Sequence, residues 1–185
     1  MTEKILLPII AGPTACSKTE MGIKLALHMG GEIVGADSRQ IYKHLDIGTA
    51  KPTMMERNLV PYHMIDFVEL DQEYNVADYV QDSSGKILEI QSSSHIPILC
   101  GGTGLYIRRL IQGIFTIPEV GKEIRSQLQQ LIHLKGMDYM YDQLMIVDPE
   151  TASRLNKNDH IRIIRALEVY HSTGMTISKL QKHHT

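Results

Sequence analysis

The most informative stretch of this chain is Gly12-Pro13-Thr14-Ala15-Cys16-Ser17-Lys18-Thr19. It has the form of a phosphate-binding loop, except that Ser17 stands where the pattern has glycine. In such a loop the backbone amides surround an anion, the lysine neutralises it, and the next helix points its positive end at the phosphates. The whole stretch therefore predicts a di- or triphosphate site, with Thr19 as a ligand for Mg²⁺. A chance match to this short pattern is the alternative, which the flanking sequence disfavours.

The flanking sequence alternates between apolar runs and helical patterns. Strands are predicted at residues 5–10, 33–37, 65–68 and 96–100, with Pro8 allowing the first to pair fully only from Ile9 onward. A helix follows the loop, with Met21, Leu25 and Met29 on one face before Gly30-Gly31, and another covers residues 76–92. This alternation predicts an α/β fold: a P-loop NTPase-like parallel sheet covered by helices on both faces.

The ends of the predicted strands indicate one ligand site. Gly12, Asp37 and Gly101 each follow a strand. Because ligands bind beyond the carboxyl ends of parallel strands, we expect these positions to meet at one cleft.

Only helical patterns follow Pro118. An apolar stripe of Ile124, Leu128, Leu131 and Ile132 ends near Gly136, and residues 137–146 form a second helix. Asp148-Pro149 has the form of an N-cap and first helical residue, and Asn158 or Asp159 can cap a fourth helix. The patterns therefore divide the chain into an α/β core domain at residues 1–117 and an all-helical segment at residues 118–185.

Composition is that of an ordinary domain of 185 residues with 43% hydrophobic content, enough for a sizeable core. Cys16 and Cys100 have no metal-ligand spacing, which favours reduced thiols in the cytoplasm. No signal peptide or membrane span is predicted. The net charge of −2 means that any RNA contact depends on a local basic patch.

Further blocks of sequence carry a resemblance to a known family. In chain order they are Asp37-Ser38-Arg39-Gln40-Ile41-Tyr42, Asp46-Ile47-Gly48-Thr49-Ala50-Lys51-Pro52, Tyr62-His63-Met64-Ile65-Asp66, Gly101-Gly102-Thr103-Gly104-Leu105-Tyr106-Ile107, and Asn158-Asp159 with Arg162-Ile163-Ile164-Arg165-Ala166-Leu167-Glu168. Together with the loop, they resemble the tRNA dimethylallyltransferases (tRNA isopentenyltransferases, the IPP transferase family). The resemblance runs from Lys4 to about Leu180, and it implies that residues 118–185 are the family's helical, tRNA-binding insertion domain.

The resemblance implies transfer of a dimethylallyl group from dimethylallyl diphosphate to the exocyclic amine of the adenosine on the 3′ side of the anticodon in tRNA. Asp37 corresponds to the family's proposed base, and Thr14 and Lys18 act at the diphosphate, with Mg²⁺ on Thr19. An Asp at this position can instead cap a turn or hold magnesium through water. A P-loop small-molecule kinase, which would bind ATP in the same loop, and an inactive RNA-binding remnant remain alternatives.

The resemblance also implies a set of tRNA contacts. They are Asp37, Ser38, Arg39, Gln40, Thr103, Arg125, Ile161, Arg162, Ile163, Ile164 and Arg165. A solvated charged face is the alternative for Arg162 and Arg165, and a tight strand-to-helix turn is the alternative for Thr103. We expect a monomer that binds the tRNA anticodon stem-loop and no membrane.

Two departures from the family bear on activity. A Cβ at position 17 costs about 1 kcal/mol if φ is positive there. Members of the family continue past the helical domain and supply a further arginine to the diphosphate, whereas this sequence stops at Thr185. We therefore expect a C-terminally truncated chain with little prenyl transfer by itself.

Overall fold

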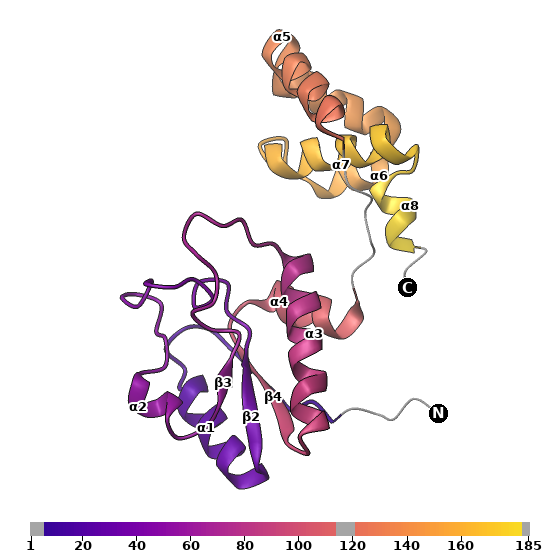
Figure 1. Cartoon of the computed structure of the whole chain (residues 1–185). Coiled ribbons are helices and arrows are strands. Elements are labelled where there is room, and N and C mark those ends of the chain that lie inside the picture. Colours follow the sequence, from indigo (N-terminus) through magenta and orange to yellow (C-terminus); the bar gives the residue numbers. More distant parts are fainter. Residues whose placement is uncertain (1–5, 114–120, 183–185) are drawn as a thin grey trace. The chain divides into compact units, whose positions relative to one another are not determined.

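The computed structural model describes residues 6–113 and 121–182 of the chain. The chain divides into two compact units, Met1–Ile114 and Phe115–Thr185 (Figure 1). The domain boundary that the sequence predicts, between residues 117 and 118, lies outside the described residues.

The first unit is built on a parallel sheet (Figure 1). Its strands are β1 (Ile9–Ala11), β2 (Gly31–Gly35), β3 (Tyr62–His63) and β4 (Ile96–Gly101). They lie in the order β1-β4-β2-β3, and every neighbouring pair is parallel. The predicted parallel sheet is therefore confirmed, and the carboxyl ends of its strands lie along one edge.

Helices cover both faces of this sheet. Successive side chains of a strand point to opposite faces, and here the apolar side chains on each face pack against helices. The helices of the unit are α1 (Lys18–Met29), α2 (Met54–Arg57), α3 (Val76–Ser92) and α4 (Gly104–Gln112). Ile33 and Ile98 pack with Ile23 of α1, whereas Val34 and Leu99 pack on the other face with α3 and α4. The predicted helix at residues 76–92 matches α3 in full.

The first strand starts later than the apolar run that precedes the loop. Its pairing with β4 begins at Ile9, which lies opposite Leu99. Pro8 has no N–H to give to the sheet, but its carbonyl accepts a hydrogen bond from the Leu99 amide at 2.9 Å. The prediction that pairing begins at Ile9 is confirmed.

The third strand was predicted in the wrong place. Residues 65–68 do not form it; the strand is the short β3, two residues long, beside β2. Met64 and Asp66 have φ values of 59° and 53°, in the left-handed region, so the chain cannot continue as a strand. Val68 makes only an isolated bridge with Tyr42.

The buried face of α1 also differs from the predicted stripe. Gly22, Ile23 and Ala26 are the buried residues, whereas Met21 is 61% exposed. A Cβ at position 22 would lie 3.3 Å from the Cys100 sulfur, so the small residues let α1 approach the sheet closely. Periodicity alone favoured the larger Met and Leu side chains as the core face.

The second unit contains helices and no strand within its described residues, 121–182, as predicted. Its helices are α5 (Lys122–Val147), α6 (Pro149–Arg154), α7 (His160–Thr173) and α8 (Ile177–Lys182). Gly136, at φ 79° and ψ 174°, breaks α5 where the sequence places the end of one helix and the start of the next. The buried core is formed by α5, α6 and α7, with Leu128, Met140, Leu144, Ala152, Ile163, Ala166 and Leu167.

The helix starts in this unit follow the predicted capping residues. The Asp148 carboxylate accepts a hydrogen bond from the Thr151 amide, and Pro149 is the first residue of α6. Of the two candidates for the next cap, Asp159 is the one that accepts from the Arg162 amide. No helix within the described residues is long and apolar enough to cross a membrane.

Candidate functional site

A pocket of about 200 Å³ lies where the carboxyl ends of the strands meet the phosphate loop. It lies entirely within the first unit. Its walls are formed by Thr14, Ala15, Cys16, Ser17, Lys18, Thr19, Asp37, Gln40, Thr49, Ala50, Tyr62, Cys100 and Gly101. The structure therefore brings the predicted loop residues 14–19, the predicted base and Gln40 to one place.

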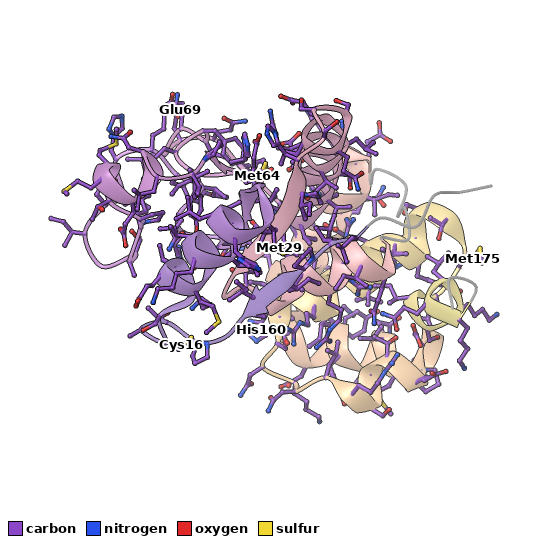
Figure 2. The ribbon with its side chains drawn as sticks, turned by 90° about the horizontal axis from the view of Figure 1, so that it is seen from below. Cys16, Met29, Met64, Glu69, His160 and Met175 are labelled. Carbon is purple, nitrogen blue, oxygen red and sulfur yellow. The ribbon has the colours of Figure 1, made fainter. Side chains whose placement is uncertain are left out.

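The loop folds around the head of Lys18, which is also the first residue of α1. The Lys18 ammonium donates to the Pro13 carbonyl and lies 3.8 Å from the Cys16 sulfur. Cys16 is exposed (Figure 2), and a Cβ at Gly12 would lie only 2.8 Å from its sulfur. Glycine at position 12 thus gives room for this tight curl of the loop.

Ser17 adopts a backbone conformation that glycine adopts more easily. Its φ is 58° and its ψ is 25°, in the left-handed region, and its side chain makes no capping hydrogen bond to the helix. The departure from the glycine pattern therefore carries the strain that a positive φ implies for a residue with a Cβ.

Replacing Ser17 with glycine is expected to tighten binding of inorganic diphosphate by up to about tenfold, which corresponds to ~1.4 kcal/mol of relieved strain. Isothermal titration calorimetry measures this affinity. Ser94→Gly is the matched control, because Ser94 also has a positive φ, 61°, but lies away from the loop between α3 and β4. The control should leave diphosphate affinity unchanged. Weaker binding by Ser17→Gly would mean that the serine hydroxyl itself contacts the ligand.

Asp37 uses its two carboxylate oxygens differently. Oδ1 accepts hydrogen bonds from the backbone amides of Arg39 at 2.9 Å and Gln40 at 3.3 Å, and so holds the turn after β2. Oδ2 takes no part in these bonds and lies toward Gly102, where a Cβ would be 3.8 Å from Oδ2 and 4.0 Å from the Lys18 ammonium. The turn-capping role and a role in proton transfer are therefore compatible.

The glycines at the end of β4 form a tight turn against the end of β2. A Cβ at Gly101 would lie 2.1 Å from the Ala36 carbonyl oxygen, so only glycine fits. The Thr103 amide donates to that same carbonyl at 3.0 Å, and its hydroxyl accepts from the Ser38 amide at 2.8 Å. Thr103 thus links the turn after β4 to the block after β2. This is the structural role that the sequence analysis gave as the alternative to a tRNA contact.

Gln40 connects the block after β2 to the loop at residues 46–52. Its side-chain amide donates to the carbonyls of Thr49 at 2.9 Å and Ala50 at 3.0 Å, and all three residues line the pocket. In this structure the Gln40 amide is thus engaged in building the pocket wall.

Lys51 and Asp66 do not line the pocket, but they hold the chain next to Ala50, and reasoning from the sequence gave them no role. The Lys51 ammonium donates to the Tyr42 carbonyl at 2.7 Å, to Asp46 at 3.0 Å and to Asp66. Burial by itself would raise the pKa of Asp66, but hydrogen bonds from Lys51 and Arg57 outweigh it and hold the pKa below its ordinary value. The sequence blocks contain Lys51 and Asp66, but the blocks do not show which side chains contact each other.

Tyr62 and Cys100 close the pocket on the side of the sheet. Burial raises the pKa of the Cys100 thiol, and the Tyr62 hydrogen bond and the Lys18 charge only partly oppose this. Burial likewise raises the pKa of the Tyr62 hydroxyl, with smaller contributions from Cys100. Both groups are therefore neutral at physiological pH.

Magnesium would have few protein ligands in this pocket. Within residues 6–113 and 121–182, no group of three or more His, Cys, Asp or Glu side chains is arranged to hold a metal ion. Mg²⁺ prefers oxygen ligands, keeps several waters and commonly joins a protein hydroxyl or carboxylate to substrate phosphates. Thr19, which lines the pocket beside Lys18, fits that pattern.

The remaining predicted tRNA contacts belong to the helical unit. Arg162 pairs with Asp159 at 2.9 Å, and Arg165 and Arg125 both pair with Glu168. Ile161 is 82% exposed, whereas Ile163 is fully buried in the helical core. A side-chain contact from Ile163 to RNA therefore does not fit the structure, because the 3.6-residue period turns this position inward; Ile164 is half-buried.

Comparison with known proteins identifies the family of this chain. A family model described as IPP transferase matches residues 40–185. The tRNA dimethylallyltransferase 2 of Geotalea uraniireducens is 46% identical over 182 residues, which are 98% of this chain and 59% of the relative. The chain thus spans somewhat more than half the length of this relative.

Two solved structures share the fold. A eukaryotic dimethylallyltransferase acting on tRNA matches 97% of this chain and 44% of its own length, with 29% identity and a TM-score of 0.85. The tRNA isopentenylpyrophosphate transferase of Bacillus halodurans matches 92% of this chain and 57% of its own length, with 36% identity and a TM-score of 0.60. These similarities confirm the predicted P-loop NTPase-like fold. With a family model that covers well over half of its residues, this chain belongs to the IPP transferase family.

Proposed function

We propose that this chain carries the catalytic pocket for transfer of a dimethylallyl group from dimethylallyl diphosphate to the exocyclic amine of the adenosine on the 3′ side of the anticodon in tRNA. The observation that supports this most is that Lys18 and Thr19 of the phosphate loop line the same pocket as Asp37. A diphosphate leaving group and a proton acceptor are the two requirements of such an alkylation. The names of the relatives support the same reaction.

The proposed chemistry follows from these groups. The amine nitrogen attacks the first prenyl carbon, the bond from that carbon to the diphosphate oxygen breaks, and its electron pair leaves with the diphosphate. The loop amides and the Lys18 ammonium stabilise the negative charge that develops on the leaving oxygen. Oδ2 of Asp37 takes the proton that the amine loses.

Magnesium would be held by the Thr19 hydroxyl and the diphosphate oxygens. When bound, it would add a positive charge at the leaving group. Lys18, the residue before Thr19, supplies a positive charge from the protein itself.

The tRNA partner has to present its adenosine out of the base stack. Turning a base out costs a few kcal/mol, which contacts in the pocket repay. Ser38, Arg39, Gln40 and Thr103 are proposed to contact the base and its neighbours, and the arginines of the helical unit to contact the anticodon stem. We expect a monomer that acts in the cytoplasm, where tRNA is found.

The experiment that tests this function measures two reactions side by side. The chain is assayed alone and extended by the part of the Geotalea relative that it does not match. Each protein is incubated with labelled dimethylallyl diphosphate and tRNA, and separately with ATP. The proposal expects tRNA-dependent release of diphosphate by the extended chain and no ATP hydrolysis above background. ATP-dependent phosphoryl transfer without prenyl transfer would instead identify a kinase.

Replacing both Arg162 and Arg165 with alanine is expected to weaken tRNA binding and flatten its salt dependence, because each lost phosphate contact reduces the slope by about one unit. Filter binding across a salt series measures this. Lys24→Ala is the control, since Lys24 is an exposed cation paired with Glu20 on α1. An unchanged slope in the double variant would identify a solvated charged face that RNA does not use.

A further inference from the structure

Glu168 is an acidic side chain that is almost fully enclosed in the helical unit. The residue is only 8% exposed. Its Oε1 accepts a hydrogen bond from Arg125 Nε at 3.2 Å, and its Oε2 accepts one from Arg165 Nη1 at 3.0 Å. Arg125 comes from α5 and Arg165 from the preceding turn of α7. One carboxylate therefore holds two guanidinium groups from two helices.

The two arginines remain accessible although their partner is buried. The side chain of Arg125 is 59% exposed and that of Arg165 is 38% exposed, against 10% for Glu168. A guanidinium has five N–H donors, and each of these hydrogen bonds to Glu168 uses one of them. The group as a whole carries one net positive charge and keeps donors for an anionic ligand.

We propose that Glu168 is a positioning residue that holds Arg125 and Arg165 in place for phosphodiester groups of tRNA. The inference rests on the proposed function, in which this unit contacts the anticodon stem. An arginine side chain that is ordered before binding does not have to lose its freedom at the moment of binding. A guanidinium held in one orientation also presents its paired donors to phosphate oxygens, which an ammonium cannot do.

The direction in which RNA affinity changes when the Glu168 charge is removed distinguishes positioning from simple electrostatics. A carboxylate beside an RNA site repels phosphate groups, so charge alone predicts that removing it strengthens binding. Positioning predicts the opposite, because the two arginines lose their common anchor. A salt bridge that only joins α5 to α7 would change the stability of the unit without a specific effect on RNA.

The test compares Glu168→Gln with the unchanged chain in binding to a tRNA anticodon stem-loop across a salt series. Glutamine keeps the size of the side chain, but only one of its two terminal atoms accepts a hydrogen bond. We expect affinity to fall about threefold to tenfold, with the salt slope unchanged because no cation is lost. The matched control is Glu150→Gln, a surface acid paired with Lys182 at 2.6 Å, which should bind no more weakly than the unchanged chain.

A double-mutant cycle then isolates the pairwise effect. In the Arg125→Ala, Arg165→Ala background, Glu168→Gln should no longer weaken binding, because nothing is left to position. Circular dichroism checks that each variant is folded. If Glu168→Gln unfolds, the variant Arg125→Lys with Arg165→Lys replaces it, since it keeps Glu168 and both charges but removes the guanidinium geometry. It should show a comparable loss of affinity.

Several results would overturn the inference. They are equal binding by Glu168→Gln and Glu150→Gln, an equal loss in the presence and absence of the arginines, and wild-type affinity in the lysine variant. Any of these, with normal binding by the unchanged chain, rejects the positioning role and leaves the proposed function intact. Failure of the unchanged chain to bind the stem-loop would instead reject the proposed function, and the inference with it.

Discussion

Asp37→Asn is expected to lower the turnover of prenyl transfer by about 10²-fold or more while binding of dimethylallyl diphosphate stays nearly constant, because a general base typically contributes 10²–10⁴. Asparagine can keep the hydrogen bonds that Asp37 makes to the backbone. An asparagine oxygen can still accept from the amides of Arg39 and Gln40, as Oδ1 does now, so the turn after β2 is preserved. What is lost is the second oxygen, the one toward Gly102 and Lys18.

Single-turnover kinetics with the extended chain measure this effect apart from product release. Asp71→Asn is the control, an exposed carboxylate on the loop before α3, and it should leave turnover unchanged. A variant of Asp37 that binds diphosphate poorly but turns over normally once saturated would move Asp37 from proton transfer to magnesium binding.

Lys18→Met is expected to lower turnover by about 10²–10³-fold, the range found when one fixed donor to a developing negative charge is removed. Methionine nearly matches the length of the lysine side chain but has no charge for the leaving diphosphate. The Lys18 ammonium lies inside the loop, on the Pro13 carbonyl, so no other cation among the pocket-lining residues can replace it.

The measurement is again the single-turnover rate, together with calorimetry of inorganic diphosphate. Lys24→Met is the matched control on the same helix, since Lys24 is exposed and pairs with the exposed Glu20. We expect weaker diphosphate binding and slower transfer for Lys18→Met alone. A variant that transfers at the normal rate would show that the loop amides suffice without this charge.

The sequence predicted the fold well where local patterns determine structure. The helix at residues 76–92 and the helix starts at Asp148 and Asp159 depend on capping residues and periodicity, which act within one element. The buried face of α1 was missed because it depends on the sheet: Gly22 and Ala26 are buried as small residues that allow close approach. The short β3 was missed because the positive φ values of Met64 and Asp66 depend on tertiary contacts.

The candidate site divides in the same way. The loop was predicted from its phosphate-binding pattern and Asp37 from its place at a strand end, whereas Gln40 was predicted from the family resemblance. The pocket contains residues 14–19 of the loop together with Asp37 and Gln40. The support given by Lys51 and Asp66 was not found, because it joins residues from separate blocks through side-chain hydrogen bonds. Glu168 belongs to one of the sequence blocks, but only the packing of α5 against α7 reveals that it holds two arginines.

The most direct test of the proposed function is the location of the added group on tRNA. tRNA is incubated with dimethylallyl diphosphate and the extended chain, digested to nucleosides and analysed by mass spectrometry. The account predicts one dimethylallyl group on the amine of the adenosine on the 3′ side of the anticodon, and its absence with the Asp37→Asn and Lys18→Met chains. Unmodified tRNA after incubation with a folded extended chain that binds both substrates, or a prenyl group on another nucleoside, would contradict it.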